Sequence, residues 1–399
     1  MRTIAFVTPW YGQDIPGGAE ALTRRTAGQM AAAGLPVEII TTTIRDFYAD
    51  WSHNAHRPGI TTIDGIPVRR FPVEARRADE FNRVNWRLTN GLEITSEEEQ
   101  IFAEEMLRSP ALLAFLADHR HEYLYVFIPY LYPTTIQGLA VAPERSIVIP
   151  CLHDEGYAYL PSVREALSKA RGLALLSRAE HALAARLLGP ADRQARLIVG
   201  AGVEPQGSGD GDRFREKYGL DGPLMLYAGR REAGKNTPLL IDYWLRYVKS
   251  GGRQATLVLI GPGEITLPDA SGDIGGEAIR DLGFVSRQDK LDAYAAATAL
   301  CQPSTHESFS IVIMESWLAR RPVLVHADCA VTVEHCRLAN GGLYFADYRE
   351  FAATTDYLFD HPAIAGQLGR QGRRYVLENF TPETVIGRFQ TLFDEVGGL

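Results

Sequence analysis

The chain has 399 residues, more than one ordinary hydrophobic core accommodates, so we expect two domains of roughly 200 residues each. A hydrophobic content of 46% with 23% charged residues is typical of a soluble globular protein. The net charge of −8 and the pI of about 5.7 argue against a general nucleic-acid-binding surface, so an anionic ligand would need local positive groups.

The first residues run directly into a predicted strand, without the apolar segment and cleavage site of a signal peptide. No apolar run approaches the length of about 18 residues that a transmembrane helix needs. We therefore expect a cytoplasmic protein, either free or peripherally associated with the inner face of the membrane.

In the first half, short segments rich in Val, Ile and Leu alternate with helical periodicity, which predicts a parallel sheet covered on both faces. Helices are predicted at Ala19–Ala33 and Glu97–Ala117. Residues 75–118 form a helical insertion, which is either a solvated flap or an acceptor-binding element. Strands are predicted at Thr3–Trp10, Val37–Thr43, Val68–Pro72, Tyr123–Ile128, Ser146–Leu152, Ala174–Ser177 and Leu197–Gly200.

Three segments of the first half follow predicted strands, where ligands bind in such sheets. Pro16-Gly17-Gly18 opens a helix, and its glycines let the backbone approach a ligand while the helix N-terminus favours phosphate. Tyr130 and Tyr132 follow another strand, and their rings either stack on a sugar or cap the core. His153 is either a structural residue or a group at the active site.

The Gly-rich stretch 200–211 is the predicted linker. It divides the chain into domains at 1–202 and 203–381, with a final helix at 382–399 that packs back on the first domain. In the second half, helices are predicted at 237–249, 287–297, 310–320, 348–359 and 382–396. Strands are predicted at Leu224–Ala228, Thr256–Ile260, Arg280–Phe284, Ala299–Gln302, Val323–His326 and Leu343–Phe345.

Histidines and cysteines gather near position 330, at His326, Cys329, His335 and Cys336. Their spacing fits no common zinc pattern, and residues 335 and 336 point in different directions unless the loop turns sharply. The cysteines form no CxxC pair, which argues against a disulfide scaffold or a redox site. We therefore predict neither a metal nor a cofactor.

Two glutamates carry the most informative pattern in the chain. Glu307 lies in a turn after a buried strand, and Glu315 is expected about two turns into a helix that starts near Ser310. A helix N-terminus binds phosphate, and carboxylates bind hydroxyl groups. A phosphate flanked by two such acids describes a nucleotide-sugar, although acidic helices also contain such pairs by chance.

A second motif places Arg230 and Lys235 directly after the strand that ends at Gly229. Arginine offers a planar fork to phosphate oxygens and lysine a mobile charge, so the pair can neutralise a diphosphate. The alternative is an ordinary exposed pair on a loop.

Together these motifs resemble the retaining GT-B glycosyltransferases of family 4, the glycosyl transferases group 1. The Pro-Ser-x-x-Glu at 303–307, the spacing of the two glutamates and the Gly-Arg with Lys-Asn at 229–236 carry the resemblance. It covers about 223–380 and is weaker in the first domain, where these enzymes bind varied acceptors. It implies an α/β fold of two Rossmann-like doubly wound domains that face a cleft.

The resemblance implies a role for each matched residue. Arg230 and Lys235 would hold the diphosphate, Glu315 the ribose hydroxyls, and Glu307 the donor sugar. The remaining donor contacts would be backbone groups of Phe309, Ser310, Ile311 and Val285, the glycines Gly17 and Gly18, and the sugar-binding His153. The chain departs from the family in having Ser308-Phe309-Ser310 in place of Gly-Phe-Gly, and Ser316-Trp317 in place of small residues, which bears on donor size.

The implied reaction is retaining transfer of a hexose from a UDP- or GDP-sugar to a glycan or glycolipid hydroxyl, for surface polysaccharide or lipopolysaccharide. No metal is expected, and the DxD sequence at Asp210-Gly211-Asp212 is predicted to be a solvated loop. The alternatives are a GT-B epimerase or phosphorylase and a catalytically silent GT-B scaffold.

Overall fold

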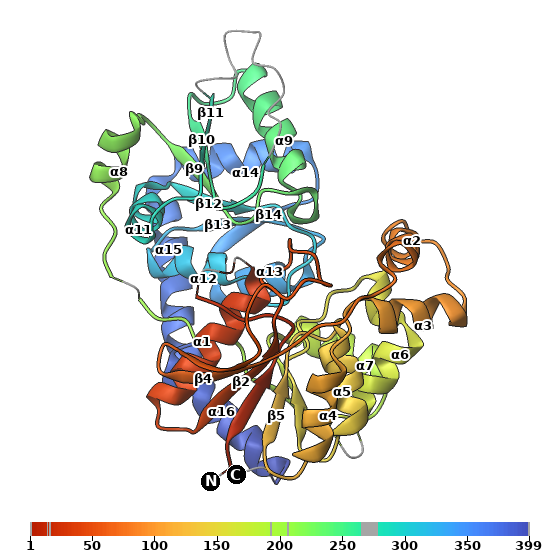
Figure 1. Ribbon diagram of the computed structural model, residues 1–399. Coiled ribbons are helices and arrows are strands. Elements are labelled where there is room, and N and C mark those ends of the chain that lie inside the picture. The colour runs from red at the N-terminus through yellow and green to blue at the C-terminus, as the bar shows by residue number, and fades with distance from the viewer. Residues whose placement is uncertain are drawn as a thin grey trace. The chain divides into compact units, whose positions relative to one another are not determined.

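The computed structural model describes residues 2–13, 15, 17–191, 194–205, 207–264 and 278–397 (Figure 1). The chain divides into two compact units. The first combines Met1–Gly202 with Glu383–Leu399, and the second is Val203–Pro382. Within the described residues, no helix is long and apolar enough to cross a bilayer.

The first unit is built on a mainly parallel sheet. Its strands are β1 (Ile4–Val7), β2 (Val37–Thr42), β3 (Gly59–Ile63), β4 (Ile66–Phe71), β5 (Leu124–Phe127), β6 (Ser146–Val148), β7 (Gly172–Leu175) and β8 (Ala195–Ile198). In the described part of the chain their order is β3-β4-β2-β1-β5-β6-β7-β8. Only β3 and β4 pair antiparallel there, in a hairpin closed by Asp64 and Gly65 at positive φ. The sequence prediction missed β3, although Asp-Gly is a common hairpin turn.

Helices connect these strands. They are α1 (Gly18–Ala32), α2 (Ala78–Thr89), α3 (Ser96–Glu105), α4 (Pro110–Asp118), α5 (Pro133–Val141), the 3-10 helix η1 (Gly156–Tyr159), α6 (Pro161–Lys169), α7 (Arg178–Leu188) and α16 (Pro382–Glu395). The last of these belongs to the first unit although it comes from the end of the chain. Arg388 Nη1 donates to Val199 O at 3.1 Å. Gly172 lies against Leu392 and Val396, since a Cβ there would come within 3.2 Å of both.

The single helix predicted over 97–117 is wrong. α3 ends at Glu105 and α4 begins at Pro110, because proline lacks an N–H and is favoured at a helix start. The insertion shares the apolar core of the first unit: the Phe102 ring stacks 5.5 Å from Phe81 within the insertion and 5.5 Å from Tyr157 of η1. Residues 75–118 are therefore packed on the first unit rather than freely solvated.

The second unit follows the sequence prediction more closely. Its strands are β9 (Leu224–Ala228), β10 (Thr256–Ile260), β11 (Ile279–Gly283), β12 (Ala299–Gln302), β13 (Val323–His326) and β14 (Gly342–Phe345). Among the described residues they form a parallel sheet in the order β11-β10-β9-β12-β13-β14. The bounds of β9, β10, β12 and β13 are those predicted, because uncharged runs of this kind are typical of strands buried on both faces.

The helices of the second unit include three that the prediction missed, α8, α13 and α15. The described elements are α8 (Gly211–Tyr218), the 3-10 helix η2 (Ala233–Lys235), α9 (Thr237–Lys249), α11 (Arg287–Ala296), α12 (Ile311–Leu318), α13 (Ala330–Ala339), α14 (Tyr348–Asp360) and α15 (Pro362–Asn379). Trp317 of α12 is fully buried, and its indole donates to Gly341 O at 2.8 Å. A Cβ at Gly372 of α15 would lie 2.2 Å from that ring, so a glycine there accommodates the tryptophan. Trp317, which departs from the small residue usual in the family, therefore serves the packing of the core.

Candidate active site

The two predicted motifs of the second unit meet at the carboxyl ends of β9 and β12. Lys235 Nζ lies 2.8 Å from Glu307 Oε1, although 72 positions separate the residues. Asn236 Nδ2 donates to Pro303 O at 3.1 Å and joins the same two loops. The Lys235 and Glu307 side chains are 22% and 10% exposed, so the pair is partly shielded from water and remains reachable.

Gln302 extends this pair and was missed by the sequence reasoning. Its Nε2 donates to the same Glu307 oxygen at 3.2 Å, while its own Oε1 is buried without a hydrogen-bond partner. Gln302 is only 4% exposed at the end of an apolar strand. Gln302 helps to orient the Glu307 carboxylate. The sequence feature that could have indicated this role is a glutamine at the end of an otherwise apolar predicted strand.

Arg230 lies in the same loop as Lys235. Its Nη2 is 3.3 Å from Glu232 Oε1, and its side chain is 27% exposed. Arg230 and Lys235 therefore provide two partly exposed positive groups near the end of β9, which suits an anionic ligand in an acidic protein.

Glu315 is the fifth residue of α12, because the helix begins at Ile311. The predicted distance of two turns into the helix is therefore wrong, and the residue lies little more than one turn from the helix start. Its Oε2 contacts Lys290 Nζ at 2.7 Å and the Tyr294 hydroxyl at 3.0 Å, both on α11. A ribose hydroxyl that binds Glu315 would share or replace these partners.

The start of α12 has an unusual backbone. Ser310 is a non-glycine residue with φ 66°, in the left-handed region, and its hydroxyl is buried without a partner. The side chain of Phe309 is 3% exposed and packs in the core, with ring centres 5.2 Å from His335 and 5.0 Å from Phe380. Only its backbone can serve the predicted phosphate contact. The first N–H groups of a helix lack partners within the helix and suit an anion, and in α12 these are the N–H groups of Ile311 and Val312, since that of Ile313 donates to Ser310 O at 3.2 Å.

Val285, the predicted base contact, follows β11 and is half-buried. Its neighbour Phe284 is 82% exposed, and Gly283 adopts φ 64°. The loop is joined to the ends of β9 and β10 by Arg231, which is 9% exposed and which the prediction also missed. From the sequence, only Arg230 and Lys235 of this motif were considered.

In the first unit, His153 follows β6, and its Nδ1 lies 3.5 Å from Glu155 Oε1. Glu180 of α7 holds the preceding loop: its two oxygens accept from the backbone N–H groups of Leu152 at 2.6 Å and Leu176 at 2.5 Å. Burial raises the pKa of Glu180 to about 8, against the lowering effect of the two N–H donors. Glu180 is thus a structural acid beneath the histidine loop.

Tyr130 and Tyr132 lie in the core of the first unit, 3% and 8% exposed. The Tyr130 hydroxyl donates to Glu155 Oε1 at 3.0 Å. The Tyr132 ring packs edge-on against Trp10, 5.0 Å between centres. Of the two alternatives for these rings, the structure favours the core.

Gly17 and Gly18 stand at the start of α1, while Pro16 lies outside the described residues. Gly17 has φ 144°, and a Cβ there would come within 1.9 Å of Glu20 Oε2. The other Glu20 oxygen accepts from the Trp10 indole at 2.8 Å. The glycine thus makes room for a carboxylate of the protein itself, which an incoming phosphate would have to displace.

The DxD sequence begins a helix instead of lying in a loop. Asp210 caps α8 by accepting from the backbone N–H groups of Asp212 at 3.0 Å and Arg213 at 3.1 Å. The predicted solvated loop is therefore wrong at this point. This role occupies one oxygen of Asp210 in a local capping function.

His335, a member of the histidine–cysteine cluster, is 1% exposed in the core of the second unit. Its Nδ1 lies 2.9 Å from the Tyr375 hydroxyl, and burial lowers its pKa to about 3. Within the described ranges, no three His, Cys, Asp or Glu side chains gather as a metal site.

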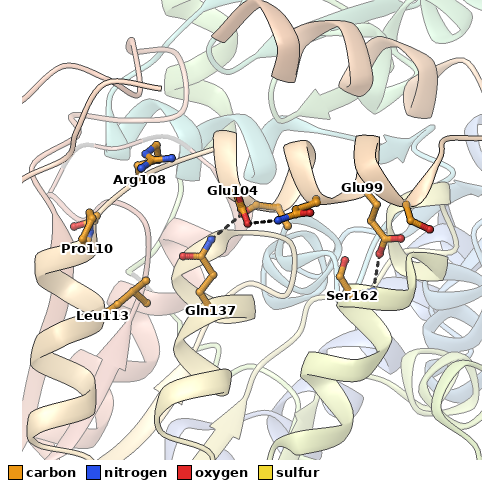
Figure 2. Close-up of a pocket in the computed structure, with 11 residues that line it drawn as sticks. Glu99, Glu104, Arg108, Pro110, Leu113, Gln137 and Ser162 are labelled. Carbon is orange, nitrogen blue, oxygen red and sulfur yellow. Dashed lines mark hydrogen bonds between the residues drawn. The ribbon is translucent and has the colours of Figure 1, made fainter. Parts of the chain in front are cut away.

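A cavity of about 580 Å³ in the first unit lies apart from these groups, and α3, α4, α5 and α6 line it (Figure 2). Hydrogen bonds brace its walls: Gln137 Nε2 donates to Ala103 O at 2.9 Å, and Ser162 N donates to Glu99 Oε1 at 2.6 Å. The predicted site residues do not line this cavity.

Comparison with known proteins supports these observations. Residues 222–361 match the family model of glycosyl transferases group 1. The alpha-D-kanosaminyltransferase of Streptomyces kanamyceticus is 26% identical over 245 residues, which cover 59% of this chain and 63% of that relative. The chain therefore matches less than two thirds of this relative's length.

Two solved structures share the fold along the chain. Sucrose-phosphate synthase from Thermosynechococcus elongatus superposes with a TM-score of 0.72 and 17% identity, over 100% of this chain and 99% of that one. Anabaena HepE in complex with UDP and glucose gives a TM-score of 0.68 and 16% identity, over 99% and 100%. The doubly wound α/β prediction is confirmed. Residues 222–361 are therefore similar to the glycosyl transferases group 1, within a chain of the GT-B fold.

Proposed function

We propose that this protein is a retaining glycosyltransferase, which moves a hexose from a UDP- or GDP-sugar to a hydroxyl of a glycan or glycolipid. The observation that carries the proposal is the 2.8 Å contact between Lys235 and Glu307. It brings a cation of the diphosphate motif and a carboxylate of the two-glutamate motif to one point. The two alternatives, a catalytically silent scaffold and a chance pair of glutamates, give no reason for these two motifs to meet.

The chemistry of the second unit suits each part of a nucleotide-sugar. Arg230 and Lys235 offer positive charge to the diphosphate, and the N-terminus of α12 adds backbone N–H groups. Glu315 offers a carboxylate to the ribose hydroxyls. Glu307 is oriented by Gln302 and Lys235, so its second oxygen can face the donor sugar. HepE, of similar fold, binds UDP and glucose, which is consistent with such a donor.

The proposed reaction takes place on one face of the sugar. The bond between the anomeric carbon and the phosphate oxygen breaks, and the acceptor oxygen bonds to that carbon from the same side. The acceptor proton passes to the departing phosphate, whose charge Arg230, Lys235 and the α12 dipole stabilise. These cations take the role that a metal has in other transferases. His153 would contact the donor sugar from the first unit.

The biological setting belongs to the proposal as well. A cytoplasmic enzyme, free or peripherally associated with the inner face of the membrane, would act in surface polysaccharide or lipopolysaccharide synthesis. The name of the kanosaminyltransferase relative supports sugar transfer in general.

The test is a panel of UDP-, GDP- and ADP-hexoses with purified enzyme. Hydrolysis of one donor in the absence of acceptor, with the anomeric configuration of the first-formed sugar read by NMR, checks both donor and stereochemistry. We expect the α-linked donor to give the α-product, and the rate to survive EDTA. An inverted product contradicts retention. Loss of activity with EDTA that manganese or magnesium restores contradicts the metal-free mechanism.

A further inference from the structure

Arg231, in the loop after β9, binds the loop after β10 and the strand β11. Its backbone N–H donates to Pro262 O at 2.8 Å, and its Nε donates to Gly261 O at 3.0 Å. Its Nη2 donates to Gly263 O, and its Nη1 forms an ion pair with the Asp281 carboxylate. Arg231 thus connects the loop after β9 with the loop after β10 and with the strand β11.

The same network extends to the loop that carries the predicted base contact. Asp281 Oδ1 accepts from Gly283 N at 3.0 Å, and Gly261 N donates to Gly283 O at 2.8 Å. The pairing of β10 with β11 shifts at this point, where Ile260 pairs with Gly283. Both backbone groups of Gly283 are therefore held by residues that Arg231 binds.

The loops also lie unusually close to one another. A Cβ at Gly261 would come within 2.0 Å of Gly229 O, so only glycine permits this contact. Gly229 directly precedes the diphosphate-binding arginine, Arg230. The clamp formed by Arg231 and Asp281 therefore connects the phosphate end of the predicted donor site with its base end.

The choice of arginine indicates a positioning role. The Arg231 guanidinium uses separate N–H groups on two carbonyls and one carboxylate, a set of directions that a planar fork meets and a lysine does not. Well-packed apolar residues stabilise a core as well as a buried ion pair does. A buried arginine that ties the loop after β9 to the loop after β10 and to β11 fixes the relative positions of these segments.

We propose that Arg231, with Asp281, sets the nucleobase preference of this enzyme by fixing the backbone of Phe284 and Val285. The inference rests on the proposed function, because it places the nucleobase of the donor at that loop. Arg231 acts as a positioning residue: it holds Gly283 and the loop after β10, and so determines where the next backbone groups stand relative to the base. Arg230 and Lys235 bind the diphosphate whatever the base.

The test measures binding of UDP, GDP, ADP and inorganic pyrophosphate by calorimetry. The proteins are the wild type, Arg231→Met, Arg231→Lys and Asp281→Asn. We expect the wild type to prefer one base, and Arg231→Met and Asp281→Asn to reduce that preference by about tenfold, as small displacements of binding groups do. Pyrophosphate affinity should change by less than about twofold, because the phosphate contacts remain. Arg231→Lys should keep part of the preference.

Arg213→Met is the matched control. Arg213 of α8 forms an ion pair with the buried Asp292 of α11 in the same unit, at 2.6 Å, and neither residue belongs to the loops that Arg231 binds. The Arg213→Met variant should have a lower melting temperature and an unchanged base preference.

The outcomes separate the two proposals. A folded Arg231→Met or Asp281→Asn with wild-type base preference overturns the clamp, as does an equal loss for all four ligands. If Arg231→Met fails to fold, Asp281→Asn and Arg231→Lys decide the question by the same ratio. A wild type that binds neither pyrophosphate nor any of the nucleotides contradicts the proposed function, and the clamp with it.

Discussion

The two units hold their predicted ligand-contacting residues in different ways. In the second unit, Lys235 and Glu307 form a partly buried ion pair at strand ends, and Glu315 on α12 pairs with Lys290 on α11. In the first unit, Tyr132 lies in an aromatic core, and Gly17 is covered by the carboxylate of Glu20. A diphosphate is bound by charged groups at fixed positions. Such a site therefore requires particular residue types at particular spacings, which can be recognised in the sequence. The first unit shows no comparable set of charged groups in its predicted contacts.

The largest effect expected on stability tests whether Tyr132 is a core residue. Tyr132→Ala should lower the free energy of unfolding by about 3–5 kcal/mol, the usual result of truncating a buried aromatic ring. In the fraction that stays folded, the KM for the donor should be unchanged. Chemical denaturation and initial-rate kinetics measure the two quantities. An unchanged stability with a raised KM for the acceptor would show that the ring binds sugar after all.

A second prediction sharpens the roles of the two glutamates. Glu307→Gln should lower kcat about 10²–10³-fold, the range seen when one group that stabilises transition-state charge is removed. Glu315→Gln should mainly raise the KM for the donor, because contacts to the ribose exist before and during reaction. Steady-state kinetics with saturating acceptor separates the two. The opposite pattern reverses the roles, and no effect in either variant makes the motif structural.

Each of the two positive side chains, Arg230 and Lys235, is expected to change the free energy of ligand binding by less than Glu307 changes the activation free energy. Arg230→Ala and Lys235→Ala should each weaken nucleoside diphosphate binding by about 1.5–3 kcal/mol, the value of a hydrogen bond to a charged group. Calorimetric titration gives the affinities, and Arg246→Ala, an exposed arginine of α9, is the control. Wild-type affinity in both Arg230→Ala and Lys235→Ala is incompatible with the diphosphate assignment.

The effect that is smallest per step is that of pH, counted per pH unit, and the two units should respond in opposite directions. The pKa of Glu180 is raised by burial from 4.5 to about 8, so between these values the folded first unit binds more protons and loses stability as pH rises. The pKa of His335 is lowered by burial from 6.5 to about 3, so the second unit loses stability as pH falls through that window.

Each slope has an upper limit of about 1.4 kcal/mol per pH unit for one proton. Thermal melts from pH 4 to 8 measure them, and His335→Gln should flatten the acid side alone. If His335→Gln leaves the acid slope unchanged, the imidazole is not the group responsible.

Prediction from sequence succeeded where a local signal was strong. β9, β10, β12 and β13 begin and end as predicted, since uncharged runs between loops mark strands buried on both faces. It failed for several helices: α3 and α4 were predicted as one helix across Pro110, and α8, α13 and α15 of the second unit were missed. Tertiary packing supports those helices more than periodicity does.

The sequence by itself determined which chemical groups are available: two cations after one strand, two glutamates around the start of one helix, and the order of strands and helices that places them at strand ends. Only the tertiary structure decided which of these groups meet. Lys235 and Glu307 come from loops 72 positions apart, and Arg231, which the sequence analysis did not consider, is buried and binds the loop after β10. Burial and hydrogen-bond partners depend on residues far away in the chain, and a local pattern of residue types contains no record of them.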